Sequence, residues 1–464
     1  MGLLAFGAGN SADQISTAFA DTPAQESLVK AGKQAPHEPR LIDTKTRLAE
    51  QVTEKIPAEE ATKVNECGTP QVLEEQMVAQ EAALAKAGFA MDLITRLSSN
   101  NQNVSVSPFG LSAVLSALDL GADPALRKAI AATMHLSPGA DKLDELRRES
   151  RLINLAVQRD PRRFSSFNAV FVDHRLPLKP GIRDLAVADV DVDVQSTDFE
   201  SQSGIDGLND LLTRKTNGRI KSILEPGSAS TLVAINALAF NDCWKTPFDR
   251  SRTADKPFTR PDGTKAERST MSGVVDSAGY RTAGPFVAVE LSYLDENFAL
   301  TLVTTQHEPA KAADFKEAVT LLAGIDLTDT KATLSLPKFG GQTDNDLLDT
   351  LSAMGLKPGL ASANQLPGFS NGLKIGRVRQ KTWLAVDEAG TEAAAVTAAE
   401  ATRAAQPKAV SVSFDKPFIY ALRYRPTGAI LMAGYVGDPD SGAQPAATET
   451  PPASDEHSTA PDKT

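Results

Sequence analysis

Apolar residues in the central part of the chain recur at helical spacing in three segments and at strand spacing in several others. The helical segments have their apolar faces along Leu73–Leu97, Leu111–Leu118 and Ile205–Leu212. Ser107-Pro108 precedes the second segment, where the serine oxygen can accept from free amides of the first turn and proline leaves no amide unpaired. Gly121 follows the last apolar position, so we expect this helix to end there.

Strand spacing is clearest in the second half of the chain. Thr231–Phe240 is an almost continuous apolar run, which is typical of a strand buried on both faces. Apolar and polar residues alternate along Lys331–Phe339, as in a strand with one buried face. Two further apolar runs, Ile419–Tyr424 and Ile430–Tyr435, flank Arg425–Gly428, a pattern that predicts a hairpin. Together these elements predict an α+β fold in which helices pack on mixed sheets.

The two ends of the chain differ in composition from the part between them. Residues 1–68 are polar, weakly periodic and interrupted by prolines, so we expect a mostly disordered N-terminal extension. Residues 441–464 are rich in Pro, Ala, Thr and acidic residues, which predicts a disordered tail. Residues 69–440 show no composition break and no internal repeat, so we interpret them as one domain.

Charge and hydropathy exclude several classes of partner. The net charge is -11, which argues against nucleic acid or an anionic membrane as the main partner. No run of about 20 apolar residues is long enough to cross a bilayer. Of the two cysteines, Cys67 and Cys243, the second lies in an apolar run. One long-range disulfide is possible, but we interpret Cys243 as a buried thiol.

Motifs of the common catalytic and cofactor sites are absent from the sequence. There is no Gly-x-Ser-x-Gly elbow, phosphate-binding loop, dinucleotide fingerprint or His-Glu-x-x-His. The five histidines show no metal-ligand spacing among themselves or with the cysteines. We therefore expect no metal, no cofactor and no enzymatic activity.

The segment that begins at Ala385 has an unusual composition. A short strand-like start is followed by about twenty residues of Ala, Thr, Glu and Val without a large apolar side chain. Composition alone favours an exposed helix or a flexible loop. However, Glu388-Ala-Gly-Thr-Glu-Ala-Ala-Ala-Val-Thr397 closely resembles the hinge of the reactive-centre loop in the serpins, a family of serine protease inhibitors.

Other segments resemble further serpin motifs in the family's order, across roughly residues 70–440. They are Ser107–Ser112, Leu120–Ala122, Asn209, Thr216–Ile220, Thr231–Phe240 with Trp244, Leu336–Phe339, Phe369-Ser370, Lys416–Phe418 and Gly434–Pro439. Each motif is weak alone, and the ordered set is strong. The resemblance implies the serpin fold, with three β-sheets, about eight to nine helices and an exposed reactive-centre loop.

The resemblance also implies a mechanism. A serpin is a suicide substrate: the protease attacks the loop and forms an acyl-enzyme, and the loop then inserts into sheet A as a new central strand. Alternate loop residues must face the core after insertion, and here they are small. The hinge residues implied are Glu388, Gly390, Thr391, Glu392, Ala393, Ala394, Ala395, Val396 and Thr397. The alternative is a non-inhibitory serpin that acts as a carrier, chaperone or binding protein.

The family's spacing from Gly390 places the reactive bond between Ala404 and Ala405. This bond would suit an elastase-like or subtilisin-like serine protease. The alternative bond, Arg403–Ala404, would suit a trypsin-like protease with an acidic pocket floor. The resemblance further implies a monomer outside the cell. The N-terminus lacks the basic and apolar segments of a signal peptide, so an intracellular site or leaderless export stays open.

Two departures from the family pattern concern the cluster that holds sheet A closed. The resemblance implies that Ser107, Asn236 and Gln380 form the shutter of this sheet and that Trp244 lies at its breach, below the loop. The family usually has histidine in place of Gln380 and serine in place of Gly110. The polar cluster is therefore altered but not lost, which puts in question how tightly the sheet is held closed.

Overall fold

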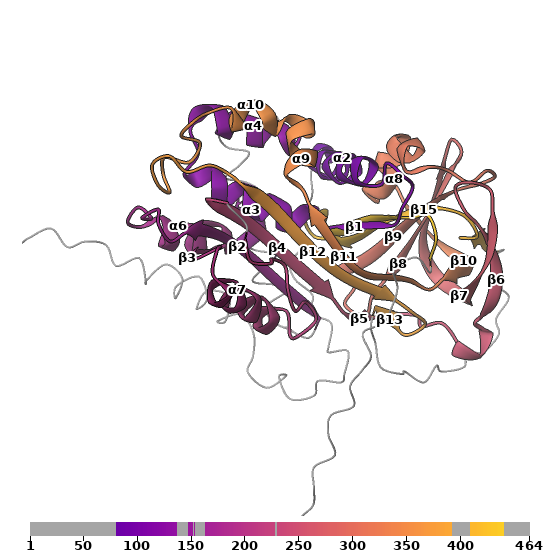
Figure 1. Cartoon of the computed structure of the whole chain (residues 1–464). Coiled ribbons are helices and arrows are strands. Elements are labelled where there is room, and N and C mark those ends of the chain that lie inside the picture. The colour runs from indigo at the N-terminus through magenta and orange to yellow at the C-terminus, as the bar shows by residue number, and fades with distance from the viewer. Residues whose placement is uncertain are drawn as a thin grey trace, which may run out of the picture. The chain divides into compact units, whose positions relative to one another are not determined.

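Helices and two hydrogen-bonded networks of strands make up the described part of the chain (Figure 1). The computed structural model describes residues 80–136, 147–151, 153, 163–227, 230–391 and 409–439, which belong to one compact unit. Within these residues there are eight α-helices. They are α2 (Gln80–Leu97), α3 (Pro108–Leu120), α4 (Pro124–Thr133), α6 (Ile182–Val190), α7 (Gln202–Lys215), α8 (Val319–Leu322), α9 (Leu348–Leu351) and α10 (Lys357–Leu360).

The smaller network contains the strands that form the candidate site. Its order is β3-β2-β4-β12-β13-β5, and β11 pairs with the other edge of β12. The strands are β2 (Phe164–Asp173), β3 (Asp193–Thr197), β4 (Leu232–Phe240), β5 (Asp242–Cys243), β11 (Phe339–Asp346), β12 (Arg377–Val386) and β13 (Gly390–Thr391). Strand β4 runs parallel to β12 and antiparallel to β2.

The larger network has the order β1-β16-β15-β9-β8-β7-β10-β14, with β6 paired to β7. Its strands are β1 (Val104–Val106), β6 (Ala254–Thr259), β7 (Lys265–Ala283), β8 (Phe286–Ser292), β9 (Phe298–Thr305), β10 (Thr328–Pro337), β14 (Val410–Ser413), β15 (Phe418–Tyr424) and β16 (Ala429–Val436). The 19-residue strand β7 pairs with β8 at one end and with β6 and β10 along the rest. The resemblance implies three sheets, whereas the strands form two networks. Two of the expected sheets are joined into the larger network by β7.

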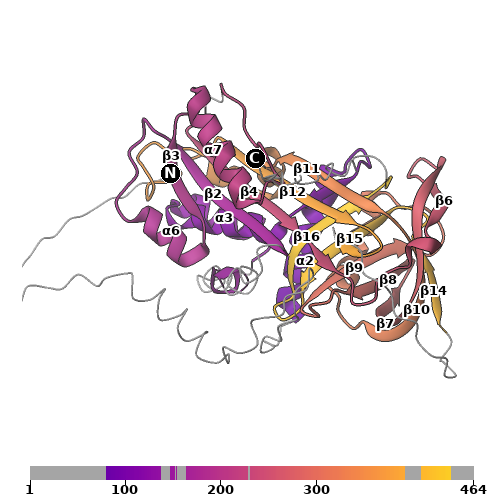
Figure 2. The same cartoon turned by 90° about the horizontal axis from the view of Figure 1, so that it is seen from below.

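Both faces of β4 are covered, which explains why its sequence is apolar except at Asn236. Leu232 and Ala234 belong to the core cluster that also contains the buried face of α3. Val233 and Ile235 point to the opposite face and pack in the cluster that contains Leu208 of α7. Figure 2 shows α7 lying across this sheet. Alternation along the strand thus assigns successive residues to two different cores.

Most local expectations are confirmed. The Ser107 hydroxyl accepts from the amide of Gly110 at 3.0 Å, so it caps α3 as expected, and the helix ends at Gly121. The hairpin of β15 and β16 is present. Cys243 is buried, but it is disulfide-bonded, so the expectation of a free thiol is wrong.

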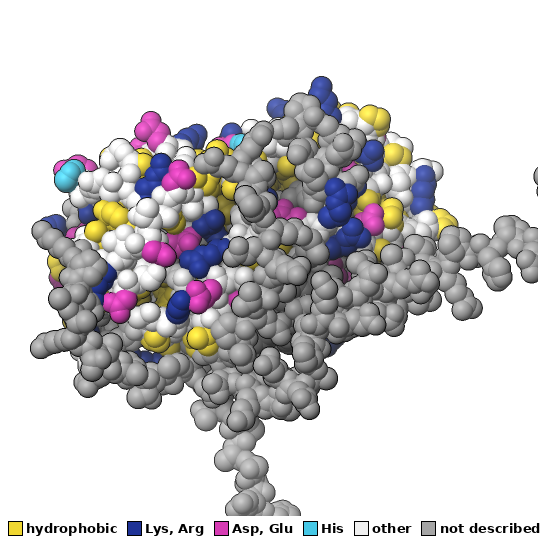
Figure 3. Space-filling model, turned by 180° about the vertical axis from the view of Figure 1, so that it is seen from behind, with side chains coloured by type: hydrophobic (Ala, Val, Ile, Leu, Met, Phe, Trp, Pro, Cys, Tyr) yellow, Lys and Arg dark blue, Asp and Glu magenta, His cyan; other side chains and the backbone are white. Residues whose placement is uncertain are grey.

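Two features are absent from the described residues. None of their helices has the length and apolar character that crossing a membrane requires. They also contain no group of three His, Cys, Asp or Glu side chains placed to hold a metal ion. On the face seen in Figure 3, basic and acidic side chains of the described residues are interspersed, so neither sign dominates it.

Candidate functional site

The candidate site starts at the seam between β4 and β12. The two strands are hydrogen-bonded neighbours from Arg377 opposite Val233 to Trp383 opposite Ala239. No strand lies between them over this length, as Figure 1 shows. The position that an inserted loop would occupy is therefore closed.

A row of buried amide side chains crosses this seam. Strand register places Asn168 of β2 opposite Asn236 of β4, and Asn236 opposite Gln380 of β12. The Asn236 amide donates to Asn168 Oδ1 at 2.7 Å and accepts from Gln380 Nε2 at 2.7 Å. Gln380 also accepts from the Ser107 amide and donates to the Ser107 carbonyl, both at 2.9 Å. The three expected shutter residues are thus brought together and joined by Asn168.

Gly110 makes room for this row. A Cβ atom built on Gly110 would lie 1.9 Å from Nδ2 of Asn236 and 2.4 Å from its Cγ. The Asn236 side chain is almost fully buried and cannot move aside without leaving its two amide partners. The glycine and the buried amide at Asn236 therefore fit each other.

The hinge lies at the end of the seam. After β12 the chain turns through Asp387, whose carboxylate accepts from the amides of Ala389 and Gly390 at 2.8 and 3.2 Å. Gly390 and Thr391 form β13, which pairs with Val386 on one side and with β5 on the other. A Cβ atom on Gly390 would lie 2.2 Å from the carbonyl oxygen of Asp242, so this close pairing requires glycine.

Thr391 is already buried in this arrangement. Its side chain has no exposed surface, and its hydroxyl lies 2.7 Å from the hydroxyl of Tyr293. Burial raises the pKa of Tyr293 far above its usual range, so its hydroxyl stays protonated and can donate. Thr391, the last described residue of the expected hinge, therefore has a specific hydrogen-bond partner.

Glu388 fixes the turn from the side. Its carboxylate accepts from the Thr253 hydroxyl at 2.7 Å and forms an ion pair with Lys338 at 2.7 Å. Burial alone would raise the pKa of Glu388, but the hydrogen bonds from Lys338 and Thr253 outweigh it and hold the pKa below its ordinary value. The carboxylate is therefore charged at neutral pH and ties the hinge to the junction of β10 and β11 and to the residue just before β6.

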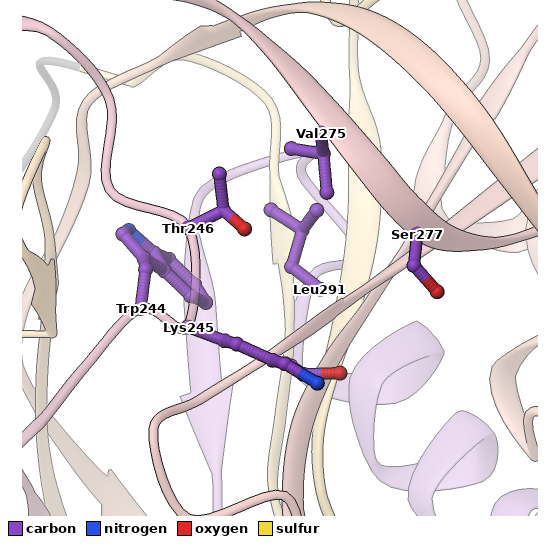
Figure 4. A pocket seen from close by; sticks show the side chains of 7 residues that line it. Trp244, Lys245, Thr246, Val275, Ser277 and Leu291 are labelled. Atoms are coloured by element: carbon purple, nitrogen blue, oxygen red, sulfur yellow. The ribbon is translucent and has the colours of Figure 1, made fainter. Parts of the chain in front are cut away.

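Trp244 supports the same turn from below. Its indole nitrogen donates to the Asp387 carbonyl at 2.9 Å, and its ring stacks on Tyr293 with centroids 4.5 Å apart. Figure 4 shows Trp244 beside a small pocket whose wall includes Val275 and Leu291. The pocket holds about 10 Å³, which is about the space of one water molecule. It is therefore too small for a ligand.

A buried charge cluster adjoins the hinge. Arg163 lies 3.1 Å from Asp242 of β5 and 3.0 Å from Asp295, so one guanidinium serves two carboxylates. Burial raises the pKa of Asp242 to about 7, although Arg163 opposes the shift, and burial also raises the pKa of Asp295. Strand register places Asp242 directly opposite Thr391.

The remaining expected site residues lie outside the described residues. They are Glu392, Ala393, Ala394, Ala395, Val396, Thr397, Arg403, Ala404 and Ala405. Sequence reasoning missed Asn168, Tyr293 and Asp242. Asn168 carried one usable signal, since it is a polar residue in the otherwise apolar run Phe167–Val172.

Comparison with known proteins assigns the family. The sequence model of the Serpin family, serine protease inhibitors, matches residues 84–439, and the chain belongs to this family. Serpins are protease inhibitors and not catalytic enzymes. A curated relative, Serpin-Z1C of Triticum aestivum, is 30% identical over 383 residues, which cover 76% of this chain and 94% of the relative.

Solved structures show the same fold. Arabidopsis AtSerpin1 in its native stressed conformation aligns with a TM-score of 0.67 at 24% identity, covering 78% of this chain and 99% of that one. Human thyroxine-binding globulin in complex with thyroxine aligns with a TM-score of 0.66 at 23% identity, covering 78% of this chain and 100% of that one. The predicted α+β serpin fold is confirmed.

Proposed function

We propose that this serpin inhibits a serine protease as a suicide substrate, through cleavage of the loop, acyl-enzyme trapping and insertion into the seam between β4 and β12. The observation that carries the proposal is the pairing of Gly390 and Thr391. These residues are antiparallel to Val386 at the end of β12 and to β5, which continues β4. They are thus already bonded to the ends of the two strands that would flank an inserted loop.

Insertion of the loop as a new strand should lower the free energy of the protein. Each ladder hydrogen bond contributes about 1 kcal/mol net, and a strand of about ten residues adds about ten of them. Thr391, Ala393, Ala395, Thr397 and Ala399 would face the core, and no charge or ring among them would oppose burial. In this proposal the amide row of Asn168, Asn236 and Gln380 is the shutter that must part.

Mixing the protein with an elastase-like and a trypsin-like protease tests the mechanism. We expect a complex that survives boiling in detergent with at least one of them. Loop cleavage should also raise the melting temperature strongly, because the cut loop becomes a strand of the sheet. Clean cleavage by all such proteases without a stable complex would refute suicide inhibition.

The reactive bond is proposed between Ala404 and Ala405, with a protease that has a shallow apolar pocket as the target. The released C-terminal fragment should then begin at Ala405. Arg403→Ala should leave elastase inhibition nearly intact, because an alanine before the cut bond needs no buried acid to offset its charge. Loss of all inhibition in this variant would assign the bond to Arg403–Ala404 and a trypsin-like target instead.

The alternative is that this serpin is not an inhibitor but a carrier, chaperone or binding protein. Thyroxine-binding globulin, which has the same fold and binds thyroxine, is the observation that supports this alternative. An unchanged melting temperature after loop cleavage would select it.

We propose an extracellular site and a monomer. The disulfide at Cys243 supports an oxidising compartment, where such bonds persist. Fractionation of the source cells tests the location.

A further inference from the structure

The segment that follows α7 lies over both strands of the seam, on the face of the sheet that α7 covers (Figure 2). We call this segment, residues Gly218–Leu224, the strap. On the β4 side, Ile220 and Ile223 of the strap are buried in the same apolar cluster as Val233 and Ile235. The strap is therefore packed firmly against β4.

On the β12 side, Arg219 of the strap reaches Trp383. Its guanidinium lies over the Trp383 ring, 5.8 Å from the ring centroid, which is within the range of a cation–π contact. Beside this contact, the strap faces Gln342 of β11 and Lys381 of β12 across a cavity of about 250 Å³. Two adjacent strap residues, Arg219 and Ile220, thus contact opposite sides of the seam.

Hydrogen bonds also hold the strap to α7. The Asn209 side chain donates to the Leu224 carbonyl at 3.0 Å and accepts from the Ile223 amide at 2.9 Å. The hydroxyl of Thr216, the residue that ends α7, accepts from the Ile220 amide at 3.1 Å. Because α7 and the strap share one apolar cluster with β4, we expect the strap to stay with β4 when the seam opens.

Insertion of the loop would pull β12 away from the strap. Neighbouring strands lie about 4.8 Å apart, so a new strand in the seam moves β12 by about that distance from β4. The guanidinium is already close to the limit of about 6 Å within which a cation attracts a ring face. The contact between Arg219 and Trp383 therefore cannot survive insertion while the strap stays on β4.

The loop would meet this contact early. Thr391 pairs with Val386 at the end of β12 in antiparallel register. Continued along β12, this register would place Ala394 opposite Trp383, only three residues after Thr391. A contact that must break at the start of a process adds to its barrier, so loss of the contact should make insertion faster.

We propose that Arg219 is a positioning residue for loop insertion: its contact with Trp383 fastens the strap across the closed seam and slows entry of the loop. This role rests on the proposed inhibitory function, since it concerns the rate of a step in that mechanism. Arg219 also has an interaction besides the one with the ring. The test must therefore separate the contribution of Trp383 from the rest.

The ratio of trapped complex to cleaved free protein, read on a detergent gel, tests this role. The acyl-enzyme is either trapped by insertion or hydrolysed, so the ratio measures insertion relative to hydrolysis. Arg219→Ala should raise the ratio about two- to fivefold, the effect of losing one partly exposed cation–π contact. Arg219→Lys keeps a cation and should raise it less. Arg214→Ala, the matched control, should leave it unchanged, because Arg214 is an exposed arginine in the last turn of α7 that does not line the cavity.

A Trp383→Leu background isolates the contact across the seam. Trp383→Leu should itself raise the ratio, and adding Arg219→Ala should raise it no further. An unchanged ratio in Arg219→Ala, an equal increase in Arg214→Ala, or a full effect of Arg219→Ala without the tryptophan would each overturn the role of Arg219 and leave inhibition standing. If the unaltered protein forms no trapped complex at all, the proposed function is refuted, and the role of Arg219 with it.

Discussion

Adding one methyl group at Gly110 tests the fit between α3 and the shutter. Gly110→Ala would place a Cβ atom 1.9 Å from Nδ2 of Asn236, well inside van der Waals contact. The backbone of α3 cannot retreat easily, because the helix is buried along nearly its whole length. The Asn236 amide must therefore leave its position.

The cost follows from the bonds that Asn236 loses. Its two amide hydrogen bonds, to Asn168 and Gln380, are both buried. Leaving a buried partner unsatisfied costs about 1–3 kcal/mol for each bond. Replacing glycine by alanine inside a helix returns about 1 kcal/mol. We expect Gly110→Ala to destabilise the native protein by about 1–5 kcal/mol.

Urea unfolding monitored by tryptophan fluorescence measures this change, and α7 supplies the control. Gly207 also lies inside a helix, but a Cβ atom there would have nothing within 4 Å. Gly207→Ala should therefore stabilise by up to about 1 kcal/mol. Introducing Gly110→Ala into an Asn236→Ala background should cost little, because the colliding amide is gone. The reasoning is refuted if Gly110→Ala unfolds at the same urea concentration as the unaltered protein or at a higher one.

Two further predictions concern the hinge. Asp242 has its pKa raised from 3.8 to about 7, so the folded state favours the neutral carboxyl. Ionisation of Asp242 therefore lowers the free energy of unfolding as the pH rises from about 4 to about 7. This loss reaches at most about 4 kcal/mol. In Asp242→Asn, the free energy of unfolding should depend less on pH across this range. An equally steep pH dependence in the variant would contradict the raised pKa of Asp242. Thr391→Val should cost about 1–3 kcal/mol by leaving the buried Tyr293 hydroxyl without its partner. Adding Tyr293→Phe to Thr391→Val should recover much of that loss, as measured by urea unfolding. If the destabilisation of the double variant instead equals the sum of the two single effects, the contact between the two hydroxyls does not stabilise the protein.

Local features of the fold could be predicted from the sequence because they depend on neighbouring residues. The cap at Ser107 and the end of α3 at Gly121 follow from turn and capping chemistry within one segment. The almost continuous apolar run of β4 likewise predicted burial on both faces, and all nine of its residues are buried.

The contacts of the site depend on distant parts of the chain. The Asn168–Asn236 contact joins residues 68 positions apart, and the Tyr293–Thr391 contact joins residues 98 apart. No periodicity within a segment predicts such a pair, because strand register decides it. Gly110 is an example. The sequence indicated only that the shutter is altered at this position, whereas the structure shows that the missing side chain leaves room for the Asn236 amide.

Hinge and shutter differ in the chemistry that holds each closed. The shutter row consists of neutral amides, and Gln380 stands where a histidine is usual. A histidine would change charge between pH 5 and 8, and an amide does not. The hinge, by contrast, adjoins Asp242, whose pKa of about 7 lies inside that range. Protonation should therefore act on the hinge and not on the shutter. A pH dependence of loop insertion in this protein should accordingly disappear in Asp242→Asn while the amide row stays intact.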